Sequence, residues 1–406
     1  MDARRTVEAV WRMHSGRLVA SLTRLVNDVG LAEDFAQDAY LAALEQWPRD
    51  GVPDEPAGWL LTTARRRAID MIRREGVRDQ KYALLAVDEE AGAATATDEE
   101  LLSLVFVACH PVLAQESRAA LTLRMVGGLS TDEIGRAFLL PSATIGQRIS
   151  RAKRTLAEAE VPFALPDPDE LPARLNAVLE VVYLIFTEGH AATSGDDWIR
   201  RDLAEQAMRL GRVLAALMPA EPEVHGLVAL MELQASRFAA RIGPSGEAVL
   251  LEDQDRSRWD RTLIAHGLTA LARARRLRKP LGPYTVQAAI AACHARAPSF
   301  ADTDWAAILA LYDALSQLAP SPIVRLNRAV VLLQVDGPQA ALDAVDELGS
   351  DPRLGRYHLY GAIRGDLLLR LGRRAEAAEE LERAAGLAPT RQERNLLMER
   401  AAAATR

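Results

Sequence analysis

Apolar residues recur at helical spacing along the chain, and Ala and Leu dominate them. Alternation of Val, Ile and Thr with polar residues, which is typical of strands, is short wherever it occurs. An amphipathic helix needs an apolar residue at every third or fourth position. The pattern therefore predicts an all-α protein.

The most informative local pattern lies between Gly128 and Leu156 and predicts two helices joined by a tight turn. Ser130 and Glu133 have the spacing of a capping box, in which the two residues satisfy free amides at a helix start. Pro141 is expected to stop the first helix and Ser142 to cap the second. In the second helix, residues at i, i+4, i+7 and i+11 predict one buried stripe: Ile145, Ile149, Ala152 and Leu156.

The opposite face of that second helix is polar and basic. Between Ser142 and Ala159 there are four basic residues and one acid, a net charge of +3. Cationic and amide side chains suit phosphate oxygens and base edges, so a DNA-binding helix-turn-helix is predicted. The alternative is a helical hairpin whose basic face is only solvated. The candidate DNA contacts are Thr144, Gln147, Arg148, Ser150, Arg151 and Arg154.

An acidic amphipathic helix is predicted from Leu31 to Trp47. The segment from Asp28 to Asp38 holds four acids and no base. Helical spacing separates the polar residues from the apolar ones, and a loop rich in proline and glycine, from Pro48 to Pro56, then breaks the helix. The polar face carries Asp34, Gln37, Asp38 and Glu45, and the apolar face carries Phe35, Ala39 and Ala42.

A basic helix is predicted from Trp59 to Arg74. Between Trp59 and Arg78 there are six arginines against two acids, a net charge of +4. Holding an open DNA strand needs phosphate neutralisation and an aromatic surface for unstacked bases, and this segment offers both. The preceding Pro-rich loop, Trp47 to Pro56, is the candidate pocket for an unstacked base. Trp59 is equally well explained as a core aromatic. The buried stripe is expected to contain Leu61, Ala64, Ala68 and Ile72.

With these helices in this order, residues 1 to about 160 resemble a group IV sigma factor of the sigma-70 class, the extracytoplasmic-function type. Ala32–Tyr40 resembles region 2.2, which docks on the clamp helices of the RNA polymerase β′ subunit. Trp59–Arg74 resembles regions 2.3 and 2.4, which melt and hold the minus-10 promoter element. Glu116–Leu156 resembles region 4, which reads the minus-35 element. The resemblance implies core RNA polymerase (β′ clamp and β flap) and promoter DNA as partners.

The resemblance also implies roles for single side chains. Asp34, Gln37 and Asp38 are expected to face polymerase. Arg67 stands where the family commonly has Asn, and Gly146 stands where many members carry a basic residue. Because Gly costs about 1 kcal/mol of helix propensity relative to Ala, base readout is expected instead from Gln147, Ser150 and Arg151. The expected minus-10 contacts are Trp59, Arg65, Arg66, Arg67, Arg73 and Arg74.

Composition limits the possible functions. The 406 residues suffice for two to four domains, and the net charge of -7 makes DNA affinity a local property. No signal peptide and no apolar run near 20 residues is visible, so a cytoplasmic protein without membrane contact is expected. Cys109 and Cys293, each followed by a His, are too far apart to suggest zinc. No metal, cofactor or catalytic residue is predicted.

Six segments are predicted along the chain. A polar linker separates the two sigma-like domains, and four prolines in twelve residues end the second one. A flexible tether lets the two domains reach separate promoter elements. The segments are 1–78, sigma region 2-like; 79–100, linker (within a polar stretch from Gly76 to Glu100); 101–160, region 4-like helix-turn-helix; 161–172, Pro-rich joint; 173–319, helical extension; and 320–406, tetratricopeptide-like repeats.

The C-terminal end matches a tetratricopeptide unit of about 34 residues that starts at His358. Asn327–Leu348 resembles a degenerate preceding unit, with Ala329 and Ala341 as small packing residues. Stacked units bind peptides or neighbouring domains on a concave surface, and the alternative is a helical array without a ligand. The consensus positions are held by Gly365, Gly372, Ala377, Leu381, Ala384 and Pro389.

Three polar clusters interrupt the extension: Thr187–His190, Leu251–Asp260 and Gly282–Gln287. Glu188 with His190, or Asp253 with Asp255, offer groups that acid-base catalysis or a metal uses. They are expected instead to form ion pairs and caps at helix junctions. The protein is therefore not expected to be an enzyme.

The whole chain resembles the subgroup of extracytoplasmic-function sigma factors with a large C-terminal extension that contains tetratricopeptide repeats. This resemblance implies control by the fused domain, through contact with the sigma domains, in place of a membrane anti-sigma factor. Two other classes stay open. One is a one-component helix-turn-helix regulator that binds DNA without polymerase, and the other is an enzyme or scaffold with an incidental DNA-binding head.

Overall fold

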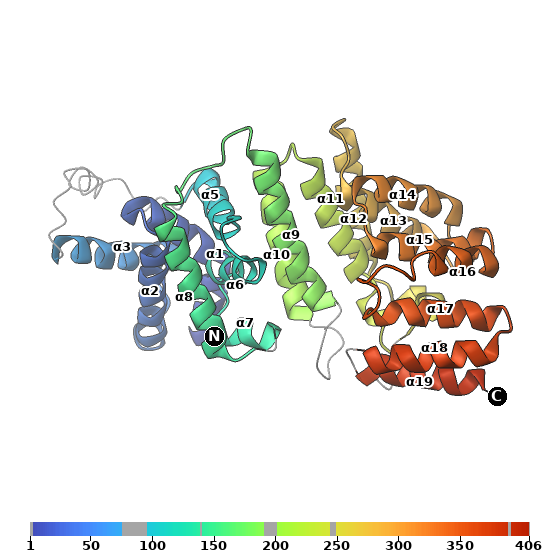
Figure 1. The fold of residues 1–406 in the computed structure, drawn as a ribbon. Coiled ribbons are helices and arrows are strands. Elements are labelled where there is room, and N and C mark those ends of the chain that lie inside the picture. Colours follow the sequence, from blue (N-terminus) through green and yellow to red (C-terminus); the bar gives the residue numbers. More distant parts are fainter. Residues whose placement is uncertain are drawn as a thin grey trace. The chain divides into compact units, whose positions relative to one another are not determined.

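The computed structural model describes residues 3–74, 96–138, 140–190, 201–243, 249–388 and 391–405. Within these ranges the chain forms helices and no strand, which confirms the all-α prediction. It divides into two compact units, Met1–Ile185 and Phe186–Arg406 (Figure 1). Across the described ranges, no helix has the length and apolar character needed to cross a membrane.

The first unit is built around helix α1 (Ala3–Val26), which packs against α2, α3, α5 and α6. Residues Leu101–Ala108 are all buried and, apart from Ser103, apolar, so α5 is a core helix that is buried on every side. Burying a side chain such as Phe106 contributes about 1.5–3 kcal/mol. The other helices of this unit are α2 (Val29–Asp50), α3 (Pro56–Arg74), α5 (Asp98–Ala108), α6 (Gln115–Met125), α7 (Thr131–Phe138), α8 (Ser142–Glu158) and the first part of α9 (Leu171–His190).

The boundaries of α2 and α3 differ from those predicted. Helix α2 continues through Pro48 and ends at Asp50, where Gly51 adopts a φ of 89°. A proline this close to the helix end removes a single backbone bond, and the Gly51 amide still donates to the Trp47 carbonyl at 3.0 Å. Pro56 is already the first residue of α3, because its fixed φ suits that position. The loop is therefore only residues 51–55.

Helix α5 starts before the predicted end of the linker. Thr97 caps it and forms a capping box with Glu100, and three acids occupy the first turn, where the helix dipole favours negative charge. Residues 98–100 are thus helical. Residues 79–95 of the predicted linker lie outside the described residues.

Helix α9 begins at Leu171, one residue before the predicted joint ends. The Arg174 guanidinium donates to the Phe106 carbonyl of α5 at 3.2 Å. The two compact units divide inside α9, between Ile185 and Phe186. A cut at the Pro-rich joint would consequently remove part of the first unit.

The second unit is an array of helices in which sequence neighbours pack together. From α13 onward each helix contacts the next, through α19, and such stacked arrangements build a core from local contacts. The helices are α10 (Arg201–Leu217), α11 (Pro222–Ala235), α12 (Arg261–Arg276), α13 (Pro283–Arg296), α14 (Trp305–Leu318), α15 (Pro322–Val335), α16 (Pro338–Asp346), α17 (His358–Arg370), α18 (Arg374–Leu387) and α19 (Arg391–Ala404), with short 3-10 turns η2 (Phe238–Ala240), η3 (Leu251–Asp253) and η4 (Arg256–Arg258).

The hairpin of α17 and α18 has the form that the repeat pattern predicts. Gly372 turns the chain with a φ of 77°, and a Cβ at Gly365 would lie 2.7 Å from Cγ of Leu381, so only glycine permits this close packing. Ala377, Leu381 and Ala384 are buried, while Pro389 lies outside the described residues. The assignment to the tetratricopeptide family stays a prediction.

The preceding hairpin of α15 and α16 begins earlier than the predicted Asn327. Helix α15 starts at Pro322, because the hydroxyl of Ser321 caps the amide of Ile323 at 3.3 Å. Ala329 and Ala341 are buried as expected.

Of the three polar clusters, Leu251–Asp260 supplies helix caps, as predicted, whereas Gly282–Gln287 is itself capped from another helix. The Asp260 carboxylate accepts from the amide of Thr262 at 2.8 Å at the start of α12, and Asp255 caps the amide of Ser257 at 2.9 Å. At the start of α13 the carboxylate of Glu223, on α11, accepts from the amides of Gly282 and Tyr284. The side chains of Glu188 and His190 lie outside the described part of the chain.

Candidate nucleic-acid and polymerase interface

Helix α8 has one buried and one exposed face, as the periodicity predicts. Its stripe of Ile145, Ile149, Ala152 and Leu156 is buried. Gln147, Ser150 and Arg151 are exposed, and within the described ranges no hydrogen bond or ion pair holds their side chains. The other candidates differ: Arg154 is exposed and lies 3.6 Å from Glu158, and Thr144 and Arg148 are half-buried at the edges of the face.

The capping box that orients the hairpin is present. The amide and hydroxyl of Ser130 donate to the Glu133 carboxylate at 2.8 and 2.9 Å, and the Glu133 amide donates to the Ser130 hydroxyl at 3.1 Å. Burial raises the pKa of Glu133, but hydrogen bonds from Ser130 and the charge of Arg12 outweigh it, so the pKa is lowered overall. The carboxylate therefore stays ionised at neutral pH.

The predicted cap at the start of α8 is wrong. Pro141 is the capping residue, no side chain caps the helix, and Ser142 is already its first residue. The Ser142 hydroxyl is instead bonded to the Thr131 hydroxyl at 3.3 Å. Gly135 also lies close to the start of α8, since a Cβ there would lie 2.7 Å from the Leu140 carbonyl oxygen. These two contacts hold α7 against the start of α8.

Gly146 faces open space. A Cβ at this position would meet no atom within 4 Å, and the backbone is ordinary helix. Packing therefore does not require glycine here. Its effect is to leave a gap on the exposed face, next to Gln147.

Helix α3 holds the predicted basic residues in three different environments. Leu61, Ala64 and Ala68 form its buried stripe. Arg66 and Arg67 are exposed, whereas Arg65 is half-buried, 3.3 Å from the Ser21 hydroxyl. For Ile72, Arg73 and Arg74 the helix is described but the side chains are not.

Trp59 is half-buried and packs edge-to-face against Trp47, with ring centroids 5.5 Å apart. Trp47 is 2% exposed, so this pair joins the ends of α2 and α3 across the short loop. Aromatic pairs of this geometry contribute about 0.5–1.5 kcal/mol beyond their burial. Trp59 thus has a core contact and still offers part of its ring to solvent.

The polar face of α2 lies where the periodicity predicts. Asp34, Asp38 and Glu45 are exposed, Gln37 is half-buried, and Phe35, Ala39 and Ala42 are buried. The Asp38 carboxylate lies 3.4 Å from the Arg67 guanidinium. An exposed pair of this kind contributes about 0–1 kcal/mol, so it leaves both groups available to a partner.

Glu33, which the sequence analysis did not single out, is the most constrained acid of α2. Its side chain is 5% exposed and accepts from Arg124 of α6 at 2.8 Å and from Lys153 of α8 at 2.5 Å. Gln37 also contacts it. A signal exists in the sequence, since Glu33 lies beside Ala32 and Ala36 on the apolar side of the helix, but its partners are 91 and 120 residues away.

These contacts join the region 2-like and region 4-like helices within the first unit. Lys153 also bonds Asp34 at 2.9 Å, the Trp11 indole donates to the Gly128 carbonyl at 2.9 Å, and Arg12 pairs with Glu133 at 2.5 Å. The exposed face of α8 remains uncovered by these contacts. One acid predicted to meet polymerase, Asp34, is therefore already paired with the recognition helix.

Comparison with known families matches both halves of this unit. The model described as sigma-70 region 2 matches residues 10–78, and the model described as sigma-70 region 4 matches residues 103–156. The ECF RNA polymerase sigma factor SigK of Mycobacterium ulcerans is 32% identical over 151 residues, which are 34% of this chain and 78% of SigK. The chain belongs to the ECF RNA polymerase sigma factor family.

Two further proteins are similar to this sigma factor. The probable ECF RNA polymerase sigma factor SigI of Mycobacterium tuberculosis is 28% identical over 165 residues, which are 38% of this chain and 56% of SigI. The uncharacterized protein R00370 of Rhizobium meliloti is 44% identical over 379 residues, covering 91% of this chain and 89% of that protein. This similarity therefore extends over both units of the chain.

Residues 174–275 match a family of unknown function, DUF6596. No solved structure matches the chain.

Proposed function

We propose that this sigma factor binds core RNA polymerase through Asp34, Gln37 and Asp38 of α2, holds the open minus-10 element with α3, and reads the minus-35 element with α8. The observation that carries the proposal is the polar face of α8, where Gln147, Ser150 and Arg151 are exposed opposite a buried stripe. An arginine can bond guanine and a glutamine can bond adenine through two hydrogen bonds each.

The chemistry of α3 supports its assignment to the melted strand. Arg66 and Arg67 offer cations to phosphates, and the accessible part of Trp59 offers a surface on which a base can stack. Arg73 and Arg74 are assigned to the same role from the family resemblance. Arg65 has a reduced role in this scheme because it is half-buried beside Ser21.

Polymerase and α8 compete for one acid in this scheme. Asp34 is bonded to Lys153, so polymerase binding at this position needs that bond to break. Because Asp34 is 68% exposed, solvent compensates most of its loss. Binding of core enzyme is thereby expected to loosen the contact between α2 and α8.

We infer that the fused C-terminal unit regulates this activity. Covalent attachment keeps the effective concentration of the unit high near the sigma domains, and the stacked helices of this unit suit binding to a segment of protein. We further propose that the unit is required for transcription, since a permanently fused inhibitor would need a signal to release it.

The experiment that tests the proposed function compares DNA binding with and without core enzyme. Fluorescence anisotropy of a labelled promoter fragment should show sequence-specific binding only when core RNA polymerase is added to the full chain. The second candidate, a one-component regulator, predicts tight and specific binding by the free protein and no further gain from polymerase. That second result would reject the sigma mechanism for this chain.

A further inference from the structure

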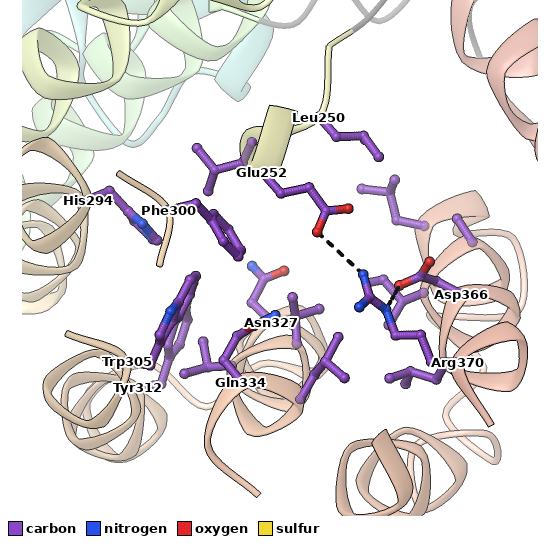
Figure 2. A pocket seen from close by; sticks show the side chains of 18 of the residues that line it. Leu250, Glu252, His294, Phe300, Trp305, Tyr312, Asn327, Gln334, Asp366 and Arg370 are labelled. Atoms are coloured by element: carbon purple, nitrogen blue, oxygen red, sulfur yellow. Dashed lines mark hydrogen bonds and ion pairs between the residues drawn. The ribbon is translucent and has the colours of Figure 1, made fainter. Parts of the chain in front are cut away.

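The second unit contains a cavity of about 440 Å³ that none of the proposed contacts uses (Figure 2). Helices α14, α15 and α17 supply most of its lining, with additions from α13, α19, the segment around η3 and the loop between α13 and α14. Pockets that bind small molecules have volumes of about 300–1,000 Å³, mostly apolar walls and a few polar groups. The size and lining of this cavity fall in that class.

One wall of the cavity is aromatic. Phe300 and Trp305 pack with ring centroids 4.9 Å apart, and His294 meets Trp305 edge-to-face at 5.3 Å. Burial, with help from the charges of Arg237 and Arg256, lowers the pKa of His294 to about 4. The imidazole is therefore neutral at physiological pH, and this wall presents flat, uncharged surfaces.

The opposite side of the cavity carries charged side chains that form ion pairs with one another. Arg370 bonds Asp366 at 3.0 Å and Glu252 at 3.4 Å (Figure 2). Asp366 also bonds Arg400. Among the lining residues these two acids and two bases are the only ionised groups, so the cavity has no net charge. A charged ligand would have to break one of these pairs or lose its hydration without a free counter-charge.

Between the two sides α15 presents two amides. Asn327 and Gln334, seven residues apart on one helix face, line the cavity with Val330 between them. Neither amide has a hydrogen-bond partner in the part of the chain that the structure describes. Each supplies both a donor and an acceptor, which complements a ligand carrying an amide or a similar donor and acceptor pair.

We propose that this cavity is a binding site for a small uncharged molecule that combines an aromatic ring system with an amide-like hydrogen-bonding edge. The ring lies against Phe300 and Trp305, and the polar edge bonds Asn327 and Gln334. The inference goes beyond the sigma mechanism and concerns binding alone, whichever way the C-terminal unit acts on transcription.

The test uses ligand-observed NMR on the full chain with four matched pairs of probes. The uncharged members are benzamide, nicotinamide, indole-3-carboxamide and N-acetyl-tryptophanamide, and the anionic partners are benzoate, nicotinate, indole-3-carboxylate and N-acetyl-tryptophan. At least one uncharged probe is expected to bind, more tightly than its anionic partner. Asn327→Leu should weaken that binding about 2- to 12-fold, the effect of one lost hydrogen bond.

Two valine variants on α15 locate the binding. Val330→Trp fills the cavity and should abolish the signal, whereas Val335→Trp, at a similarly exposed position that does not line the cavity, should leave it unchanged. Both positions are exposed, so folding can be checked by circular dichroism. The proposal is overturned if no uncharged probe binds, if anions bind equally well, or if both tryptophan variants behave alike.

Discussion

At the scale of single residues, the buried carboxylate of Glu33 connects α2, α6 and α8 of the first unit. Two cations that are themselves only 15% and 17% exposed neutralise it. Removing one partner of a buried pair is costly, because the remaining charges have lost water and have no replacement. Glu33 therefore links the helices of regions 2 and 4, although it was not among the predicted functional residues.

Glu33→Gln should lower the free energy of unfolding by about 2–4 kcal/mol, somewhat less than for fully buried pairs because Arg124 and Lys153 keep some water. Urea denaturation of the full chain measures this. Asp34→Asn is the matched control: it also removes an ion pair with Lys153 but at a 68% exposed side chain, so it should cost under about 1 kcal/mol. Equal losses for the two variants would show that Glu33 is not the linking charge.

Two glycines of the helix-turn-helix should respond in opposite directions to alanine. Gly146→Ala should raise thermal stability, by up to about 1 kcal/mol, because the site is open and alanine favours helix. Gly135→Ala should lower stability, since the new Cβ would lie 2.7 Å from the Leu140 carbonyl oxygen. Thermal unfolding of both variants is the measurement. A destabilised Gly146→Ala would mean that the glycine has a packing role in this hairpin.

At the scale of elements, the sequence predicted the features that depend on residues close together in the chain. The stripe of α8 and the polar face of α2 follow from helical periodicity alone, and the capping box at Ser130 follows from spacing. The Glu33 cluster could not be predicted, because no periodicity links residues 91 and 120 positions apart. Ser142 failed as a cap because Pro141 already occupies the capping position.

Substitutions on α2 and α8 should separate two steps of initiation. Replacing Asp34 and Asp38 together with Ala should weaken binding to core polymerase and leave the α7–α8 hairpin folded, since both carboxylates are exposed. Arg151→Ala or Gln147→Ala should leave core binding unchanged and cost about 1–3 kcal/mol in promoter recognition. Core binding is measured by fluorescence and recognition by competition between promoter and scrambled DNA. Intact core binding in the Asp34 and Asp38 variant would mean that the acidic face is only solvated.

At the scale of the whole molecule, the chain combines a sigma unit with a larger helical array. The boundary inside α9 decides where the two can be cut. Cutting at Leu165 would remove Arg174 and its bond to α5. A cut after residue 190 avoids this loss because it keeps α9 complete. Cutting after Tyr357 removes only α17–α19.

The truncations after residue 190 and after Tyr357 should both reduce promoter output. The reduction should be about 5- to 150-fold if the coupling between units is of ordinary strength. The measurement is transcription in vitro at equal concentrations of folded protein, with folding checked by circular dichroism. Increased output after either cut would identify the second unit as an inhibitor. Unchanged output from both would identify it as an independent module.

The most direct test of the central claim is run-off transcription with purified core RNA polymerase and the full chain. Templates would carry promoter fragments selected from the host genome by the reconstituted holoenzyme. Wild-type protein should give transcripts with defined start sites, and Arg151→Ala should give far less from the same templates while still binding core. Specific DNA binding by the free protein with no transcript after core is added would contradict the account.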